Sequence, residues 1–171
     1  MKTLKIIFCL LFSSVLTAQN SENFSIENSK VIWEHVYSAN ISQEEIKEIL
    51  SKDAILSPIA TNFTGTTNPV DPNCQESQAI FMYGQLQYFA TIDFKEGKYR
   101  VTVSGIQIIP SNTISLYGVE STTNPSAYES FIIKNSRDDF RGNNMAQNSL
   151  NCLNNYFLTT FEFKETLKED W

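Results

Sequence analysis

The chain has 171 residues, and its 13 Lys and Arg against 19 Asp and Glu give a formal net charge of −6. This acidic balance argues against nucleic acid and against anionic membrane surfaces as non-specific partners, because both are negatively charged. The length suits a single domain with a hydrophobic core of ordinary size.

The first 18 residues predict a cleavable export signal. Lys2 and Lys5 precede an apolar run over residues 6–12, and small residues then lead to Ala18. This order is typical of a signal peptide over residues 1–18. The run is shorter than the roughly 20 residues needed to cross a bilayer, so no transmembrane segment is expected after cleavage. The expected location is the periplasm or the extracellular space.

Beyond the predicted signal, the composition divides the chain into an arm, a domain and a tail. Residues 19–29 are polar, with Phe24 and Ile26 as their apolar side chains, and predict a flexible arm. A single domain is expected over residues 30–161, followed by a charged tail over residues 162–171.

Residues 30–37 are rich in β-branched and aromatic types and predict the first strand. Alternation places Trp33, His35 and Tyr37 on one face of this strand. His35 is the single histidine of the chain, so a Ser-His-Asp or Cys-His site would have to use it. No catalytic partner is indicated by the sequence, and we interpret His35 as a packing or surface residue.

A helix is predicted to begin after Ser42. Ser42 and Glu45 have the spacing of a capping box, in which each side chain satisfies the other residue's backbone N–H. Ile41 and Ile46 have the spacing of a hydrophobic staple around the same cap. The helix is expected to end near Lys52. Residues 54–64 are strand-like, and residues 65–78 have the composition of a loop.

Residues 79–94 predict a strand that leads into a β-hairpin with a two-residue turn at Glu96-Gly97. This register pairs apolar residues on one side: Phe94 with Tyr99, Ile92 with Val101 and Ala90 with Val103. It pairs polar residues on the other side: Asp93 with Arg100 and Thr91 with Thr102. A slip of one residue would mix the two faces. Gly105 is expected to form a bulge, because the apolar alternation changes parity beyond Ser104.

Residues 110–135 predict two short strands, one around Ile114, Leu116 and Val119 and one over residues 131–133. Residues 138–161 show helical spacing, with Ala146, Leu150, Leu153, Phe157 and Phe161 on one stripe. Asp138 and Asp139 are expected to begin this helix, where carboxylates interact favourably with the helix dipole.

The order of these elements resembles that of a family of exported bacterial proteins, domain of unknown function 4468. The similar segments are Lys30 to Tyr37, the Ser42 to Leu50 helix and the Phe89 to Val103 hairpin. The resemblance implies an α+β fold like that of the TATA-binding protein: a curved antiparallel sheet with two helices packed on one face, in the order β-α-β-β-β-β-α. It implies no established activity, and such a fold does not imply DNA binding.

The two cysteines beyond the predicted signal are Cys74 and Cys152. An oxidising compartment would permit a disulfide between them. The alternative is two free thiols, with Cys152 packed as a small apolar residue. Together with His35 they lack the spacing of a compact zinc motif, so neither a metal nor a cofactor is expected.

Aromatic side chains are the most suggestive functional signal. Phe89 falls on the polar side of the predicted hairpin, and Trp33 and Tyr37 lie elsewhere in the sheet, so these three are the candidates for a binding surface. The alternative is that the aromatic residues form the core.

The sequence therefore predicts an exported non-enzymatic binding or envelope-interaction module, whose ligand is an unknown protein or small molecule of the cell envelope. One alternative is a hydrolase with a carboxylate site that is not visible in the sequence, which should show convergent carboxylates in a pocket. The other is a structural accessory domain that pairs through an uncovered sheet edge.

Overall fold

The structure is a computed structural model that describes residues 23–38, 41–52, 56, 63–74, 84–110, 114–116, 119–121, 124–134 and 139–164. The predicted signal peptide and most of the predicted tail lie outside these ranges. None of the helices in the described ranges combines the length and hydrophobicity of a membrane-crossing segment.

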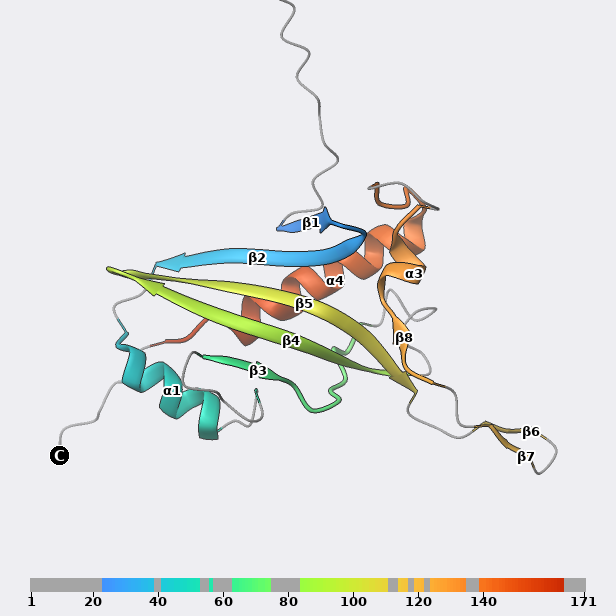
Figure 1. Ribbon diagram of the computed structural model, residues 1–171, viewed down its shortest axis with the longest axis horizontal. Helices are drawn as coiled ribbons and strands as arrows, with labels where there is room; N and C mark the ends of the chain where they lie inside the picture. Colours follow the sequence, from blue (N-terminus) through green and yellow to red (C-terminus); the bar gives the residue numbers. More distant parts are fainter. Residues whose placement is uncertain are drawn as a thin grey trace, which may run out of the picture.

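The described chain combines a curved antiparallel sheet with helices (Figure 1). Its elements, in order, are β1 (Phe24–Glu27), β2 (Lys30–Ser38), α1 (Gln43–Lys52), β3 (Thr64–Thr66), β4 (Gly84–Lys95), β5 (Lys98–Pro110), β6 (Ile114–Leu116), β7 (Val119–Ser121), β8 (Ser126–Ala127), α3 (Glu129–Ile132) and α4 (Asn144–Thr160).

The main sheet has the strand order β1-β2-β5-β4-β3, and β8 pairs with β5 beyond the end of β2. β6 and β7 form a two-stranded sheet of their own. The α+β class with a curved antiparallel sheet, which the sequence predicts, is confirmed.

One face of the sheet carries the core, because α4 packs across it, while none of the helices in the described ranges covers the other face (Figure 1). The predicted stripe of α4 is fully buried, and Ile46 and Leu50 of α1 join the same core cluster. Inward side chains of β2, β4 and β5 complete that cluster, among them Trp33, Leu86, Tyr88, Ala90, Ile92, Val101, Val103, Ile106 and Ile108.

The predicted hairpin register is confirmed in all five pairs, from Phe94 opposite Tyr99 to Ala90 opposite Val103. Gly97 adopts a φ of 67° in the turn, a conformation that glycine reaches without steric cost. Gly105 has a φ of 59° and lies where two residues of β5 stand opposite one residue of β4. This bulge moves the inward position from Val103 to Ile106, which explains the change of parity.

The capping box of α1 is also confirmed. The Ser42 backbone N–H donates to Glu45 Oε2 at 3.0 Å, and the Glu45 backbone N–H donates to Ser42 Oγ at 3.3 Å. Ile46 is fully buried and Ile41 packs at the edge of the core. The local sequence therefore determines both the start of α1 and the face it turns to the sheet.

The prediction of a flexible arm over residues 19–29 is wrong for Phe24–Glu27, which form β1. Phe24 is buried and its ring lies 6.4 Å from that of Phe157. β1 pairs with β2 through a tight turn in which Asn28 and Ser29 both have positive φ angles. Burial of one aromatic side chain and pairing along β2 together hold this short strand.

Two expectations in the second half are also wrong. Phe131 and Ile132 belong to the short helix α3 rather than to a strand, while Ile133 makes an isolated bridge to Phe140. The last helix begins at Asn144, five residues after Asp139, because Asn143 is its N-cap and accepts a hydrogen bond from the Ala146 backbone N–H at 2.9 Å. The backbone of Asp139 instead accepts a hydrogen bond from the Lys134 N–H.

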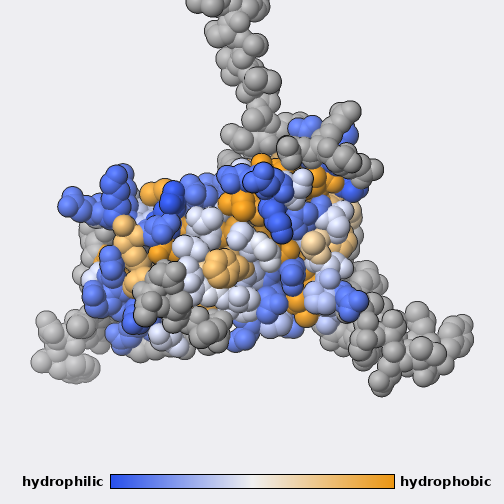
Figure 2. Space-filling view, in the orientation of Figure 1, coloured by the Kyte–Doolittle hydropathy of each residue, from blue (hydrophilic) through white to orange (hydrophobic). Residues whose placement is uncertain are grey.

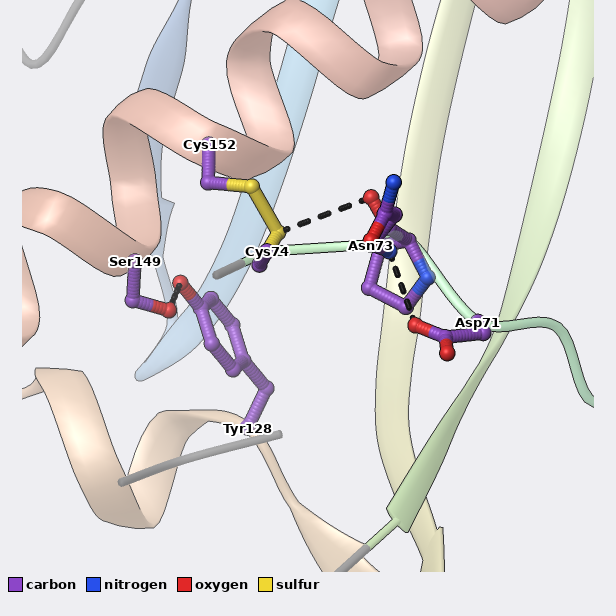
Figure 3. Close-up of a disulfide and its surroundings, with 7 residues drawn as sticks. Asp71, Asn73, Cys74, Tyr128, Ser149 and Cys152 are labelled. Atoms are coloured by element: carbon purple, nitrogen blue, oxygen red, sulfur yellow. Dashed lines mark hydrogen bonds between the residues drawn. A yellow bond between two sulfur atoms is a disulfide. The ribbon is translucent and has the colours of Figure 1, made fainter. Parts of the chain in front are cut away.

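A disulfide joins Cys74 to Cys152 across a sequence separation of 78 residues, with the two Cα atoms 5.7 Å apart. It connects the segment between β3 and β4 to the middle of α4 (Figure 3). On the same side of α4, the hydroxyls of Tyr128 and Ser149 are hydrogen-bonded at 2.7 Å. Both contacts therefore attach peripheral segments to the same helix.

The double variant Cys74→Ser with Cys152→Ser should lower the free energy of unfolding by about 4.5 kcal/mol, because opening a loop of this length increases the entropy of the unfolded chain. Urea denaturation of the oxidised protein and of this variant measures the difference. Equal midpoints for the two proteins would contradict the expectation.

Several tyrosine hydroxyls are buried against α4. Tyr37 donates to the carbonyl oxygen of Leu158 at 3.1 Å, and Tyr99 donates to that of Phe161 at 2.7 Å. Tyr88 is buried against the ring of Phe157, and no hydrogen-bond partner of its hydroxyl is found among the residues that the structure describes. Burial raises the pKa of all three phenols, and of Tyr128, above the ordinary value of 10.0.

The protein should therefore lose stability as the pH rises above 10. The unfolded chain ionises its phenols near pH 10, whereas the folded chain keeps these protons, so the unfolded state binds fewer protons. Each retained proton steepens the fall by about 1.4 kcal/mol per pH unit. Urea unfolding at a series of pH values from 9 to about 11 tests this, and a flat profile would contradict it.

Candidate functional site

The face of the sheet that turns away from α4, here called the open face, consists of the outward side chains of β2, β3, β4 and β5. In Figure 2 the centre of this face is mostly pale, and both strongly hydrophilic and strongly hydrophobic residues lie around it. Among the described residues, the exposed large hydrophobic side chains are Val36, Phe89 and Met145. Val36 and Phe89 lie on the open face, whereas Met145 lies on α4.

Phe89 is 41% exposed, and its cross-strand neighbours are Thr66 of β3 and Ser104 of β5. Residues directly opposite each other in a sheet have Cβ atoms about 4.5–5.5 Å apart. Gln87 and Thr91 are the next outward residues along β4 on either side. The ring of Phe89 is therefore surrounded by hydroxyl and amide side chains, and its position on the polar side of the hairpin is as predicted.

Uncharged polar residues continue in rows beside Phe89. Thr64, Thr91 and Thr102 lie in one row across β3, β4 and β5. In the row on the other side, Gln87 pairs with Gln107. The Gln87 side chain is held in place, because its Nε2 donates to the carbonyl oxygen of Thr67 at 3.1 Å. These residues were not identified from the sequence, since their alignment depends on three strands being paired in a particular register.

The charged residues of the open face gather toward the end of the hairpin. Arg100 Nη2 lies 3.0 Å from Asp93 Oδ2, and Arg100 Nη1 lies 3.7 Å from Glu34 Oε2. The hydrogen bond that the guanidinium donates to Asp93, and next the charge of Glu34, raise the pKa of Arg100. The exposed Val36 stands opposite Arg100 across β2 and β5. The guanidinium thus already has two carboxylate partners, which lowers its attraction for an anionic ligand.

The structure corrects two of the three candidate binding residues. Trp33 is fully buried and Tyr37 is 8% exposed, because both point toward α4. The Trp33 ring lies 5.2 Å from that of Phe157, and the Tyr37 ring stacks on that of Tyr99 at 4.9 Å. These two aromatic residues therefore form the core, and only Phe89 of the three lies on a free surface.

A hydrogen-bond network accompanies this aromatic core. Asn154 Oδ1 accepts from Trp33 Nε1 at 2.9 Å and from Asn23 Nδ2 at 2.8 Å. His35 Nδ1 lies 3.1 Å from Asn23 Oδ1, and the His35 ring packs between those of Trp33 and Tyr37. Asn154 was missed in the sequence, although a buried amide on the apolar stripe of α4 is itself a signal of such a network.

His35 thus packs in the sheet and bonds to an amide, and none of these contacts belongs to a Ser-His-Asp or Cys-His arrangement. Within the described part of the chain, the His, Cys, Asp and Glu side chains make no cluster of three that could hold a metal ion. The contacts of His35 in the described part of the chain are thus one hydrogen bond and the packing of its ring.

A hollow of about 370 Å³ lies where the start of α1 meets the β4–β5 turn. It is lined by Ile41, Ser42, Gln43, Phe94, Lys95, Glu96, Gly97, Lys98 and Tyr99. Glu96 is the one carboxylate in this lining, whereas glycoside hydrolysis uses two carboxylates on either side of the bond that breaks. Among the described residues, the lining of this hollow thus supplies one carboxylate.

Comparison with known proteins gives one structural match. Neither a protein family nor a curated protein matches the chain. The match is the crystal structure of a TBP-like protein from Parabacteroides distasonis ATCC 8503, with 18% sequence identity and a TM-score of 0.46, over 81% of this chain and 91% of that chain.

The variant Asn154→Ala should lower the free energy of unfolding by about 2 kcal/mol, because it leaves the buried indole N–H of Trp33 and the amide of Asn23 without their acceptor. The neighbouring exposed Asn155→Ala is the matched control and should change stability by less than about 0.5 kcal/mol. Denaturant unfolding of both variants measures the difference, and equal losses would rule out this role for the Asn154 side chain.

Proposed function

We propose that this protein is an exported, non-enzymatic binding module that holds its ligand in the cell envelope on the open face of the sheet. The observation that carries the proposal is the exposure of Phe89. This aromatic residue lies on β4, a strand that pairs with β3 on one side and β5 on the other. Exposed aromatic residues on a rigid scaffold are the usual centres of binding surfaces. The two neighbouring strands fix the backbone of Phe89, so little conformational entropy is lost on binding.

Export is the other half of the proposal. It rests on the order of basic, apolar and small residues over residues 1–18, which is typical of a signal peptide. The disulfide between Cys74 and Cys152 is compatible with it, because such bonds persist in oxidising compartments.

We also propose that the chain belongs to the family called domain of unknown function 4468. The three segments that carry the resemblance correspond to β2, α1 and the β4–β5 hairpin, the elements that build the sheet and one of its helices. These segments set the architecture and leave the ligand undefined.

The alternative of an accessory domain that pairs through a sheet edge has less support. β1 and β3, the outer strands of the main sheet, have four and three residues. Such short edges offer few backbone groups for pairing with another chain. The open face instead spans four paired strands, β2, β5, β4 and β3.

The variant Phe89→Ala should lose the binding of envelope components that the unchanged protein retains. The protein, expressed from its complete sequence, purified and immobilised, is incubated with a solubilised envelope fraction, and the retained protein and carbohydrate are measured. We expect Phe89→Ala to reduce specific retention about tenfold or more, since central aromatic residues of binding surfaces contribute about 2 kcal/mol or more.

Met145→Ala is the matched control, because Met145 is an exposed hydrophobic residue on α4, with 38% of its surface exposed. It should retain the same components as the unchanged protein. Equal retention by all three proteins would show that the open face is not the binding surface.

A further inference from the structure

The side chains around Phe89 indicate the chemistry of the ligand. Its nearest outward neighbours are Thr66, Ser104, Gln87 and Thr91, and Gln107 follows beside Gln87. All of these residues are uncharged. Their hydroxyls and amides can both donate and accept hydrogen bonds. This part of the open face is complementary to a neutral ligand that is rich in hydrogen-bonding groups and has one apolar side.

A charged ligand fits this surface poorly. Arg100 already faces Asp93 and Glu34, so its charge is neutralised by partners on the same face. The chain as a whole carries a net charge of −6, which disfavours nucleic acids, acidic peptides and anionic lipid surfaces. These charges disfavour an anionic occupant, and the described side chains around Phe89 carry no countercharge for a cation, so charge complementarity favours an uncharged occupant.

A protein partner fits less well than a small neutral polymer. Among the described residues of the open face, Val36 and Phe89 are the exposed large hydrophobic side chains, and they are not adjacent. Val36 stands opposite Arg100, whereas Phe89 stands opposite Ser104. Protein interfaces usually have a contiguous apolar centre, which the separation of these two residues does not provide.

From this arrangement we propose that the open face binds an uncharged saccharide chain, with the ring of Phe89 packed against the C–H face of one sugar. This inference rests on the proposed binding function and names its ligand class. A sugar ring combines an apolar C–H side with hydroxyls around its rim. Phe89 would contact the apolar side, while Gln87, Gln107 and the neighbouring Thr and Ser hydroxyls would bind the rim directly or through water.

The pairing of the strands adds a geometric argument. Neighbouring strands lie about 4.8 Å apart, and outward residues along one strand repeat about every 7 Å. Thr64, Thr91 and Thr102 therefore form a line of hydroxyls beside the ring, with Gln87 and Gln107 on its other side. Such a surface offers contacts to more than one sugar along a chain, without a deep pocket.

The experiment measures direct binding of defined saccharides to the purified protein by isothermal titration. The probes are neutral oligosaccharides of glucose, mannose and N-acetylglucosamine, and purified peptidoglycan sacculi are tested in parallel by co-sedimentation. The two arms distinguish a free neutral polysaccharide from the sugar backbone of the cell wall. At least one probe should bind, with an affinity that changes less than about twofold on raising the salt concentration, because no charges are paired.

The variants assign the binding to the open face. Phe89→Ala should weaken binding about tenfold or more, Gln107→Ala several-fold, and Phe89→Trp should preserve it, since the larger ring offers the same packing surface. Met145→Ala should bind like the unchanged protein. Far-ultraviolet circular dichroism of each variant confirms that the fold is kept, which is expected because these side chains are exposed or lie on the outer face.

Three results would each overturn the saccharide inference: no probe binds, the binding is abolished by salt, or the binding is unaffected by Phe89→Ala. If Phe89 is nevertheless required for retaining an envelope protein, the saccharide inference fails while the binding module stands. If neither a saccharide nor any envelope component depends on Phe89, both proposals fail.

Discussion

The packing of α4 against the inner face of the sheet organises the rest of this molecule. The ring of Phe157 lies 5.2 Å from that of Trp33 and 5.0 Å from that of Tyr88, so one residue of the helix contacts strands on both sides of β5. Asn154, one turn earlier, accepts hydrogen bonds from Trp33 and Asn23. Apolar burial supplies the attraction, whereas the amide fixes the helix at one position along the sheet.

This packing also explains the character of the opposite face. Most of the aromatic side chains on β2, β4 and β5 point toward α4, which leaves threonine, serine, glutamine and charged residues to point outward. Phe89 departs from that division. It forms no part of the core, and an exposed aromatic ring on a central strand has no role in stability that its contacts reveal. Its exposure is the reason that we propose a binding role for it.

Much of the fold could be predicted from the sequence, because it depends on patterns within short segments. The hairpin register follows from alternation around Glu96-Gly97, and the bulge follows from a glycine where the parity changes. The short strand β1 was missed, since its few apolar residues gain stability only from β2 and Phe157. The helix α3 was missed because three successive apolar residues fit a strand or a helix equally well.

The candidate site was harder to predict, because it depends on contacts between distant segments. Trp33 and Tyr37 were assigned to a surface, although pairing of β2 with β5 places both on the same side as Val101 and Val103. That pairing joins residues more than sixty positions apart, so no pattern within either segment alone predicts it. The outward position of Phe89 was predicted correctly, because its side of the sheet follows from the hairpin alone.

The disulfide has one more consequence, for the integrity of the molecule under attack by proteases. Cys74 and Cys152 enclose β4, β5, the β6–β7 hairpin and α3 between them. A single cut of the backbone anywhere in that interval leaves two fragments that are still covalently joined. In an environment that contains proteases, a nicked molecule would therefore keep both halves of its sheet together until the bond is reduced.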